Sequence, residues 1–209
     1  MSAGKGSKSG PKNFDSYTKY ALSDVEIQRC LAKCDTLEKE LVIKLGVFYG
    51  FRRDDMCKLE ISNIDFNNRR IRYWEEKKDK TREVPMSDEI ALLITKYLAT
   101  LPRNAKYLFS SRFADKTKTG SEPIGSATMY RLFQEILKDA GIAPPIGKTS
   151  RPFHALRGTC VKAWKRKGMD IAHIAEILGD EIETVQLHYG KATTNEVEEE
   201  MNRIINKSA

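Results

Sequence analysis

Residues 151–192 read RPFHALRGTCVKAWKRKGMDIAHIAEILGDEIETVQLHYGKA, and this stretch decides the fold. Five apolar residues recur at helical spacing and predict the buried stripe of one amphipathic helix: Phe153, Leu156, Cys160, Ala163 and Trp164. His154 and Arg157 are three residues apart, so they lie together on a neighbouring ridge of that helix. A guanidinium group forms paired hydrogen bonds with phosphoryl oxygens. The stretch therefore predicts a phosphate site beside a packed helix.

The second half of the stretch predicts two shorter helices joined by a tight turn. The first covers about 171–178 and ends at Gly179, and the second carries Tyr189 near its end. Asp180 is followed three residues later by Glu183, a pattern that favours Asp180 as the N-cap of the second helix.

Three boxes of this stretch resemble the C-terminal half of the catalytic domain of tyrosine recombinases, the phage-type integrase family. They are the His-x-x-Arg box at 154–157, the Leu-Gly-Asp turn at 178–180 and the Thr-x-x-x-His-Tyr ending at 184–189. Each box alone is a weak pattern, but the order and spacing together make a specific signal. The resemblance extends with less detail over about residues 17–191.

A fourth box lies upstream, after the helix that stops near Gly50. The segment 49–59, YGFRRDDMCKL, resembles the family's Gly-Leu-Arg-x-x-Glu-Leu box. The resemblance implies that Arg52 is the first catalytic arginine, at the start of a helix. It also implies that Asp55 is the acidic residue that supports this arginine.

Between these boxes the sequence predicts a three-stranded meander over 64–66, 70–74 and 82–85. The remaining segments predict helices, which begin at the Ser23–Glu26 capping box, at Asp35 with Glu38, at Ser87 and at about Ser126. The predicted fold is therefore α+β and mainly α, with one small antiparallel sheet.

The family has a catalytic lysine at the tip of the second hairpin. Counting back from Val84 assigns that lysine to Lys77, whereas counting forward from the strand reaches Glu76. This sequence thus carries one extra residue in the hairpin. Lys78 and Lys80 remain alternatives to Lys77.

The resemblance implies one division of chemical roles without cofactor or metal. Arg52 and Arg157 clamp the scissile phosphate, Lys77 protonates the leaving 5′ oxygen, and His154 assists the phosphoryl oxygen or the phenol proton. Tyr189 attacks the phosphorus and forms a 3′-phosphotyrosyl bond. A phenol ionises only near a pKa of ~10, so such fixed cations and proton acceptors are needed.

Asp180 is the main departure from the family, which usually has His or Trp at this position. A carboxylate pointing inward would repel the phosphate, which also favours the capping role for Asp180. His188 is a candidate to replace the missing hydrogen-bond donor, or to support Tyr189.

Charge and composition favour a polyanionic partner. The 209 residues carry 36 Lys and Arg against 29 Asp and Glu, a net charge of +7. No apolar run is long enough to span a membrane, and the four cysteines indicate reduced thiols rather than a zinc site. We expect double-stranded DNA as partner, no small-molecule substrate, and a cytoplasmic, nucleoid-associated protein, or one in the host cytoplasm if virus-encoded.

Residues 1–16 predict a flexible tail or linker, and 17–209 a catalytic domain without the family's N-terminal core-binding domain. Thr193 with Glu196 is expected to cap a last amphipathic helix. Its apolar stripe covers the chain's own core or, as in the family, packs into a neighbouring protomer. The second reading implies a tetramer on DNA.

Three other functions compete with recombination. A type IB topoisomerase uses near-identical groups to relax DNA, and a non-catalytic DNA-binding module could keep the fold alone. Asp65 with Glu75-x-Lys77 also imitates the pattern with which some nucleases bind Mg²⁺. That pattern is short, and it leaves His154, Arg157 and Tyr189 unexplained.

Overall fold

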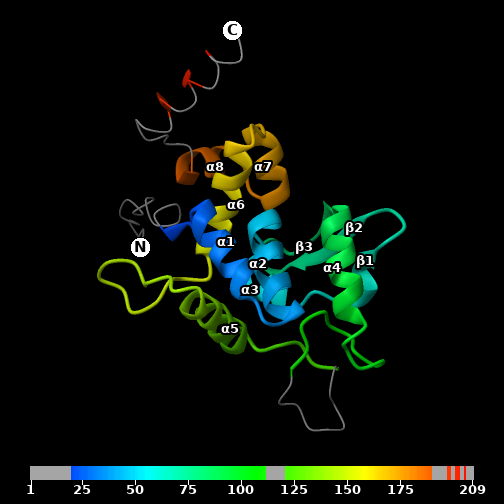
Figure 1. Cartoon of the computed structure of the whole chain (residues 1–209). Helices are drawn as coiled ribbons and strands as arrows, with labels where there is room; N and C mark the ends of the chain where they lie inside the picture. The colour runs from blue at the N-terminus through cyan, green and yellow to red at the C-terminus, as the bar shows by residue number, and fades with distance from the viewer. Residues whose placement is uncertain (1–19, 112–120, 190–196, 199–200, 203–204, 206–209) are drawn as a thin grey trace, which may run out of the picture.

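The computed structural model describes residues 20–111, 121–189, 197–198, 201–202 and 205, with side chains omitted for 187–189. Within this part of the chain the helices are α1 (Asp24–Lys33), α2 (Leu37–Tyr49), α3 (Arg53–Cys57), α4 (Asp88–Leu98), α5 (Ser126–Asp139), α6 (Ala155–Arg166), α7 (Ile171–Leu178) and α8 (Ile182–Tyr189). The strands are β1 (Ile64–Asp65), β2 (Arg70–Glu75) and β3 (Lys80–Pro85), with single 3-10 turns η3 (Ile61–Asn63) and η4 (Glu76–Lys78). The predicted fold class is confirmed (Figure 1).

The three strands form one antiparallel sheet in the order β1-β2-β3. The predicted meander is confirmed, but β2 continues to Glu75, which pairs with Lys80 at the start of β3. Side chains of β2 alternate between exposed and buried, as expected when one face of a sheet packs on the core. This alternation carries the carboxylate of Glu75 inward, on the same face as Ile71 and Tyr73.

Helix starts follow the side chains that cap them. Ser23 and Glu26 form the predicted capping box of α1, and the Ser87 hydroxyl accepts a hydrogen bond from the Ile90 amide at the start of α4. The prediction that Asp35 starts the second helix is wrong. The Thr36 hydroxyl caps α2 instead, because it accepts from the Lys39 amide at 3.2 Å.

Helix α2 lies at the centre of the molecule, between the α6–α8 group and the sheet with α4 (Figure 1). It contacts α6, α4 and α5, and the approach to α6 is close. A Cβ atom at Gly46 would lie 2.6 Å from Cδ1 of Leu156, so the contact requires glycine. Helix α6 also belongs to a second apolar cluster with α7 and α8, so it connects the two parts of the core.

Parts of the C-terminal segment are described. Residues 197–198, 201–202 and 205 are helical, in agreement with the predicted last helix. Val197, Met201 and Ile205 are exposed by 46%, 57% and 61%, so they are not buried on this chain's own core. The predicted cap at Thr193 and Glu196 and the predicted tail 1–16 lie outside the described residues. No helix in the described part is long and apolar enough to cross a bilayer.

Candidate functional site

Arg52 and Arg157 converge on one carboxylate, that of Asp180. Nη2 of Arg52 lies 3.0 Å from Oδ1 of Asp180, and Nη2 of Arg157 lies 2.5 Å from Oδ2. Arg52 is the N-cap residue of α3, as predicted, and Arg157 is a buried residue of α6. The two guanidinium groups, which are far apart in the sequence, thus face a single small anion.

Arg157 is held by the ends of two helices. It donates to the carbonyl oxygens of Gly50, at the end of α2, and Leu178, at the end of α7, both at 2.8 Å. Carbonyls at helix C-termini lack intrahelical donors and carry partial negative charge, so they suit a buried cation. The side chain of Arg157 is only 3% exposed, so these contacts fix its position.

Arg52 is held by two further carboxylates. Its Nη1 forms a short hydrogen bond with Oε1 of Glu75, which is fully buried, and lies 3.9 Å from Oδ2 of Asp55. The burial of Arg52 alone would lower its pKa, but Asp180, Glu75 and Asp55 outweigh burial and raise it. Asp55 therefore lies beside Arg52, where the sequence predicted its support.

The carboxyl group of Asp55 is itself in an unfavourable electrostatic environment. Burial raises its pKa from 3.8 to about 6, although Arg52 acts in the opposite direction. An acid with a raised folded pKa contributes stability that is complete below its unfolded pKa and is lost as pH rises through the folded pKa. At neutral pH the ionised Asp55 therefore reduces the stability of the fold.

Asn in place of Asp55 is expected to raise the free energy of unfolding at pH 7.5 by roughly 2–3 kcal/mol, because the amide mimics the uncharged acid. Below about pH 4 the advantage should vanish. Urea denaturation at several pH values between 4 and 8 measures both effects. If the free energies of unfolding of the wild type and the variant differed by the same amount at every pH, the raised pKa of Asp55 would be contradicted.

The lysine that reaches the site is Lys78. Its Nζ donates to the carbonyl oxygen of Gly179 at 2.5 Å and lies 3.6 Å from Oδ1 of Asp180. Lys77 and Lys80 are exposed. Successive residues of a 3-10 turn point about 120° apart, so the turn η4 directs only one of its lysines toward Gly179. Of the three candidates, Lys78 therefore lies at the arginine pair, and the assignment of the catalytic lysine stays a prediction.

Asp180 is not the cap of α8, and that prediction is wrong. Helix α8 begins at Ile182, and the Val185 amide donates to the carbonyl of Glu181, not to that of Asp180. The carboxylate of Asp180 turns inward to the cations instead. Burial would raise its pKa, but Arg157, Arg52 and Lys78 outweigh burial and hold the pKa below its usual value. Asp180 is therefore ionised at neutral pH.

Sequence reasoning missed the pair of Glu75 and Arg82 as part of this site. Nε of Arg82 lies 3.9 Å from Oε2 of Glu75, and its Nη2 donates to the carbonyl of Glu176 near the end of α7. This pair leaves no room beside Gly179, where a Cβ atom would lie 2.9 Å from two Arg82 atoms. The alternation of β2 was the available signal, because it places Glu75 on the buried face.

His154 and Tyr189 lie on the helices that hold Arg157 and follow Asp180, respectively. His154 is half-buried and is the N-cap residue of α6. The helix therefore begins at Ala155, one residue after the first residue of the His-x-x-Arg box. Tyr189 is the last residue of α8, the helix that begins two residues after Asp180. The side chains of Tyr189 and His188 lie outside the described part of the structure, and their roles stay predictions.

The nuclease pattern does not form one site. Asp65 pairs with Arg70 at one end of β2 and accepts hydrogen bonds from Asn68, whereas Glu75 lies at the other end among arginines. Within the described residues, no group of three or more His, Cys, Asp or Glu is arranged to hold a metal ion.

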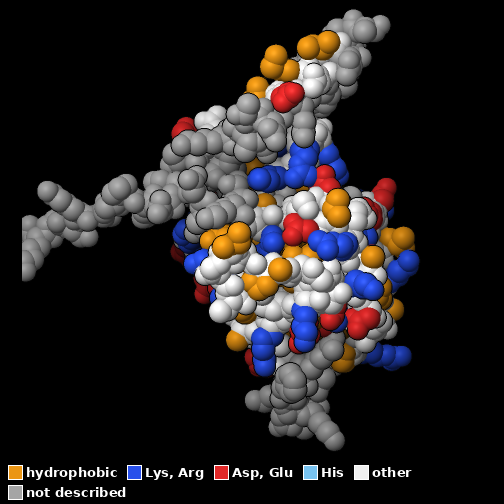
Figure 2. Space-filling view, turned by 60° about the vertical axis from the view of Figure 1, so that its left-hand side comes forward, with side chains coloured by type: hydrophobic (Ala, Val, Ile, Leu, Met, Phe, Trp, Pro, Cys, Tyr) orange, Lys and Arg blue, Asp and Glu red, His pale blue; other side chains and the backbone are white. Residues whose placement is uncertain are grey.

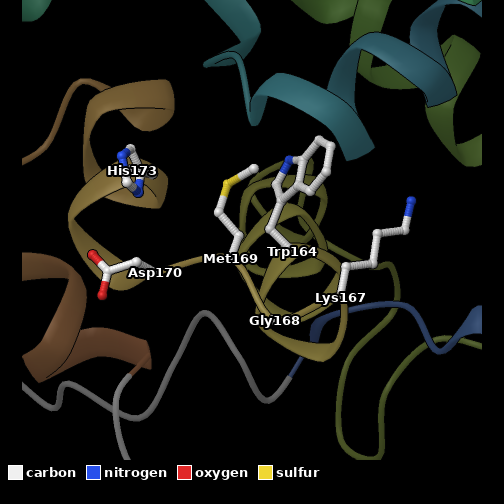
Figure 3. Close-up of a pocket in the computed structure, with 6 residues that line it drawn as sticks. All are labelled: Trp164, Lys167, Gly168, Met169, Asp170 and His173. Carbon is white, nitrogen blue, oxygen red and sulfur yellow. The ribbon is translucent and has the colours of Figure 1, made fainter.

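An open pocket lies elsewhere, at the connection between α6 and α7. Trp164 and Met169 project to the same side of this connection, Asp170 is the N-cap of α7, and His173 lies within the first turn of α7 (Figure 3). None of the predicted site residues lines the pocket. The outer surface in Figure 2 shows Lys and Arg spread among acidic and apolar side chains, with a group of them near the top of the body.

Known proteins match both the sequence and this structure. The profile of the phage integrase family matches residues 21–196. The chain is 26% identical over 184 residues to tyrosine recombinase XerA of Pyrococcus horikoshii, covering 88% of this chain and 60% of that protein. The crystal structure of XerA recombinase superposes with a TM-score of 0.71 at 25% identity, over 88% of this chain and 62% of the other.

A DNA-bound structure has the same fold. The XerH site-specific recombinase bound to its difH substrate superposes with a TM-score of 0.66 at 21% identity, over 87% of this chain and 53% of the other. The chain spans only part of each of these relatives, 60%, 62% and 53% of their lengths. The matched part contains the arginine pair, the hairpin lysines and the two helices after α6.

Proposed function

Because the chain belongs to the phage integrase family, we propose that it is the catalytic part of a site-specific DNA recombinase, which cuts and rejoins DNA strands through Tyr189. One observation carries the proposal: Arg52 and Arg157 meet at a single carboxylate. Two oxygens on one central atom resemble the non-bridging oxygens of a phosphodiester. A clamp that holds such an anion also suits the charge that develops on phosphate during substitution.

The proposed reaction needs only side chains of this protein and DNA. The phenolic oxygen of Tyr189 attacks phosphorus, and the bond from phosphorus to the 5′ oxygen breaks. The departing 5′ oxygen takes a proton from Lys78, and the phenol proton passes to a base, for which His154 is the candidate. The product is a 3′-phosphotyrosyl bond and a free 5′ hydroxyl. Attack by a 5′ hydroxyl of a partner strand reverses the step and exchanges the strands.

Covalent capture on a nicked duplex tests this proposal. When the nick lies just downstream of the cut, the short fragment that carries the new 5′ hydroxyl dissociates, so rejoining stops and the protein stays attached to DNA. We expect an adduct that survives denaturation, forms in the presence of a metal chelator, and maps to the peptide containing Tyr189. Salt-sensitive binding without an adduct would favour the non-catalytic module. Adduct formation with relaxation of supercoiled plasmid but no strand exchange would favour a topoisomerase.

Ala in place of Lys78 is expected to slow single-turnover cleavage by about 10²–10⁴-fold, the usual contribution of a general acid. Ala in place of Lys77, its exposed neighbour, serves as the matched control and should change the rate only a few-fold. Sulfur in place of the bridging 5′ oxygen should restore cleavage by the Lys78 variant, because a thiolate leaves without a proton. A larger defect in the Lys77 variant would return the role of general acid to Lys77.

We further propose that the protein acts as an oligomer on double-stranded DNA, a tetramer in the complete reaction. The exposed stripe of Val197, Met201 and Ile205 supports this, because it offers apolar surface to a neighbouring protomer. The catalytic domain in this proposal is 17–209, and the protein works in the cytoplasm with the DNA. Light scattering with and without a bound duplex measures the assembly.

A further inference from the structure

The clamp of Arg52 and Arg157 is already filled by a side chain of the same protein. Each oxygen of the Asp180 carboxylate contacts a different arginine, at 3.0 and 2.5 Å. The carboxylate is 13% exposed, so little water surrounds it. An incoming phosphate would have to occupy the same donors and would meet a negative charge at contact distance. Carboxylate and phosphate therefore cannot both occupy the clamp.

We propose that Asp180 is an internal ligand of the phosphate clamp, which a DNA phosphate displaces before strand cleavage. This inference rests on the proposed function of Arg52 and Arg157 as phosphate ligands. In the closed form Asp180 keeps the site occupied and its charge neutralised. In the open form the carboxylate leaves, and the freed donors of both arginines bind the phosphate.

The charge balance of the cluster supports an exchange of anions. Besides Asp180, the buried acids are Asp55 and Glu75, and both already contact Arg52. Arg157 has no other carboxylate partner among the described residues, only the carbonyls of its neighbouring helix ends. Departure of Asp180 thus leaves Arg157 without an anion. A phosphate in its place restores the pairing.

The same displacement reaches Lys78 and α8. Nζ of Lys78 is 3.6 Å from Asp180, so loss of the carboxylate removes its anionic partner there and leaves its hydrogen bond to the Gly179 carbonyl. Asp180 also stands two residues before the first residue of α8, the helix that ends in Tyr189. The segment just before it is fixed, because Arg82 packs against Gly179 and donates to Glu176. A movement of Asp180 therefore displaces the α8 side of the turn rather than the α7 side.

The substitution Asp180→Asn tests whether Asp180 competes with DNA for the arginine clamp or only stabilises the fold. We expect about tenfold tighter binding of a fluorescent nicked duplex at fixed salt, because the competing closed form is lost. The same variant should unfold at a lower urea concentration than the wild type, since the buried arginines lose an anion. Gln in place of Glu181, an exposed neighbour, removes the same charge and should change the affinity less than twofold.

The outcomes distinguish this inference from the proposed function. If the wild type forms the covalent adduct but the Asp180 variant binds DNA no more tightly than the Glu181 control, the internal ligand is refuted. If no adduct forms but the Asp180 variant binds DNA tightly, the internal ligand stands and the enzymatic function fails.

A second readout covers a variant too unstable for the binding assay. Inorganic sulfate, added alone at constant ionic strength, should raise the melting temperature of Asp180→Ala more than that of the wild type. Equal shifts for the two proteins would refute the inference, because the clamp would then be equally open in both.

Discussion

Phe in place of Tyr189 is expected to abolish the covalent protein–DNA adduct, with a loss of roughly 10⁴-fold or more in single-turnover cleavage. The substitution removes one oxygen, which is the proposed nucleophile, and leaves an aromatic ring of the same shape. The contacts of the arginine clamp are made between the side chains of Arg52, Arg157 and Asp180, so we expect the variant to keep them. Quantification of the adduct on a denaturing gel measures the effect.

Binding of the same nicked duplex provides the control for the Tyr189→Phe variant. Its affinity should remain within about twofold of the wild-type value, because phosphate contacts dominate DNA affinity. An adduct of normal yield in the variant would show that another residue is the nucleophile. A matching loss of affinity would show that Tyr189 binds DNA or supports α8 rather than attacking the phosphate.

The fold was predictable wherever local chemistry determines it. The Ser23 capping box and the alternation of apolar residues along β2 each act within a few residues, so the sequence displays them directly. The helix after His154 was predicted for the same reason, because its apolar stripe has helical spacing. Asp35 failed as a helix start because Thr36, one residue later, also carries a capping oxygen.

The site was less predictable because its decisive contacts join residues far apart in the chain. Asp180 has the pattern of a helix cap, and only the approach of Arg52 and Arg157 turns its carboxylate inward. The position of Lys78 at the cluster depends on the direction of a 3-10 turn, which counting along the hairpin does not fix. Glu75 required both the register of the sheet and the position of Arg52.

Ala in place of Arg157 is expected to have two large effects. Cleavage should fall by about 10³-fold, as when a fixed donor to the developing charge is removed. The free energy of unfolding should fall by about 3–5 kcal/mol, because Asp180 loses its shortest ion pair in the interior. The carbonyls of Gly50 and Leu178 also lose their donors. Urea denaturation and the nicked-duplex assay measure the two effects separately.

Lys in place of Arg157 distinguishes charge from hydrogen-bond geometry. A lysine ammonium can neutralise Asp180, so the variant should recover part of the stability lost with Ala. It cannot reproduce the planar fork that reaches Gly50, Leu178 and an anion together, so cleavage should stay at least about 10²-fold below wild type. Wild-type cleavage in the lysine variant would mean that Arg157 acts as a point charge. In that case the paired oxygens of Asp180 would no longer be evidence for a phosphate clamp.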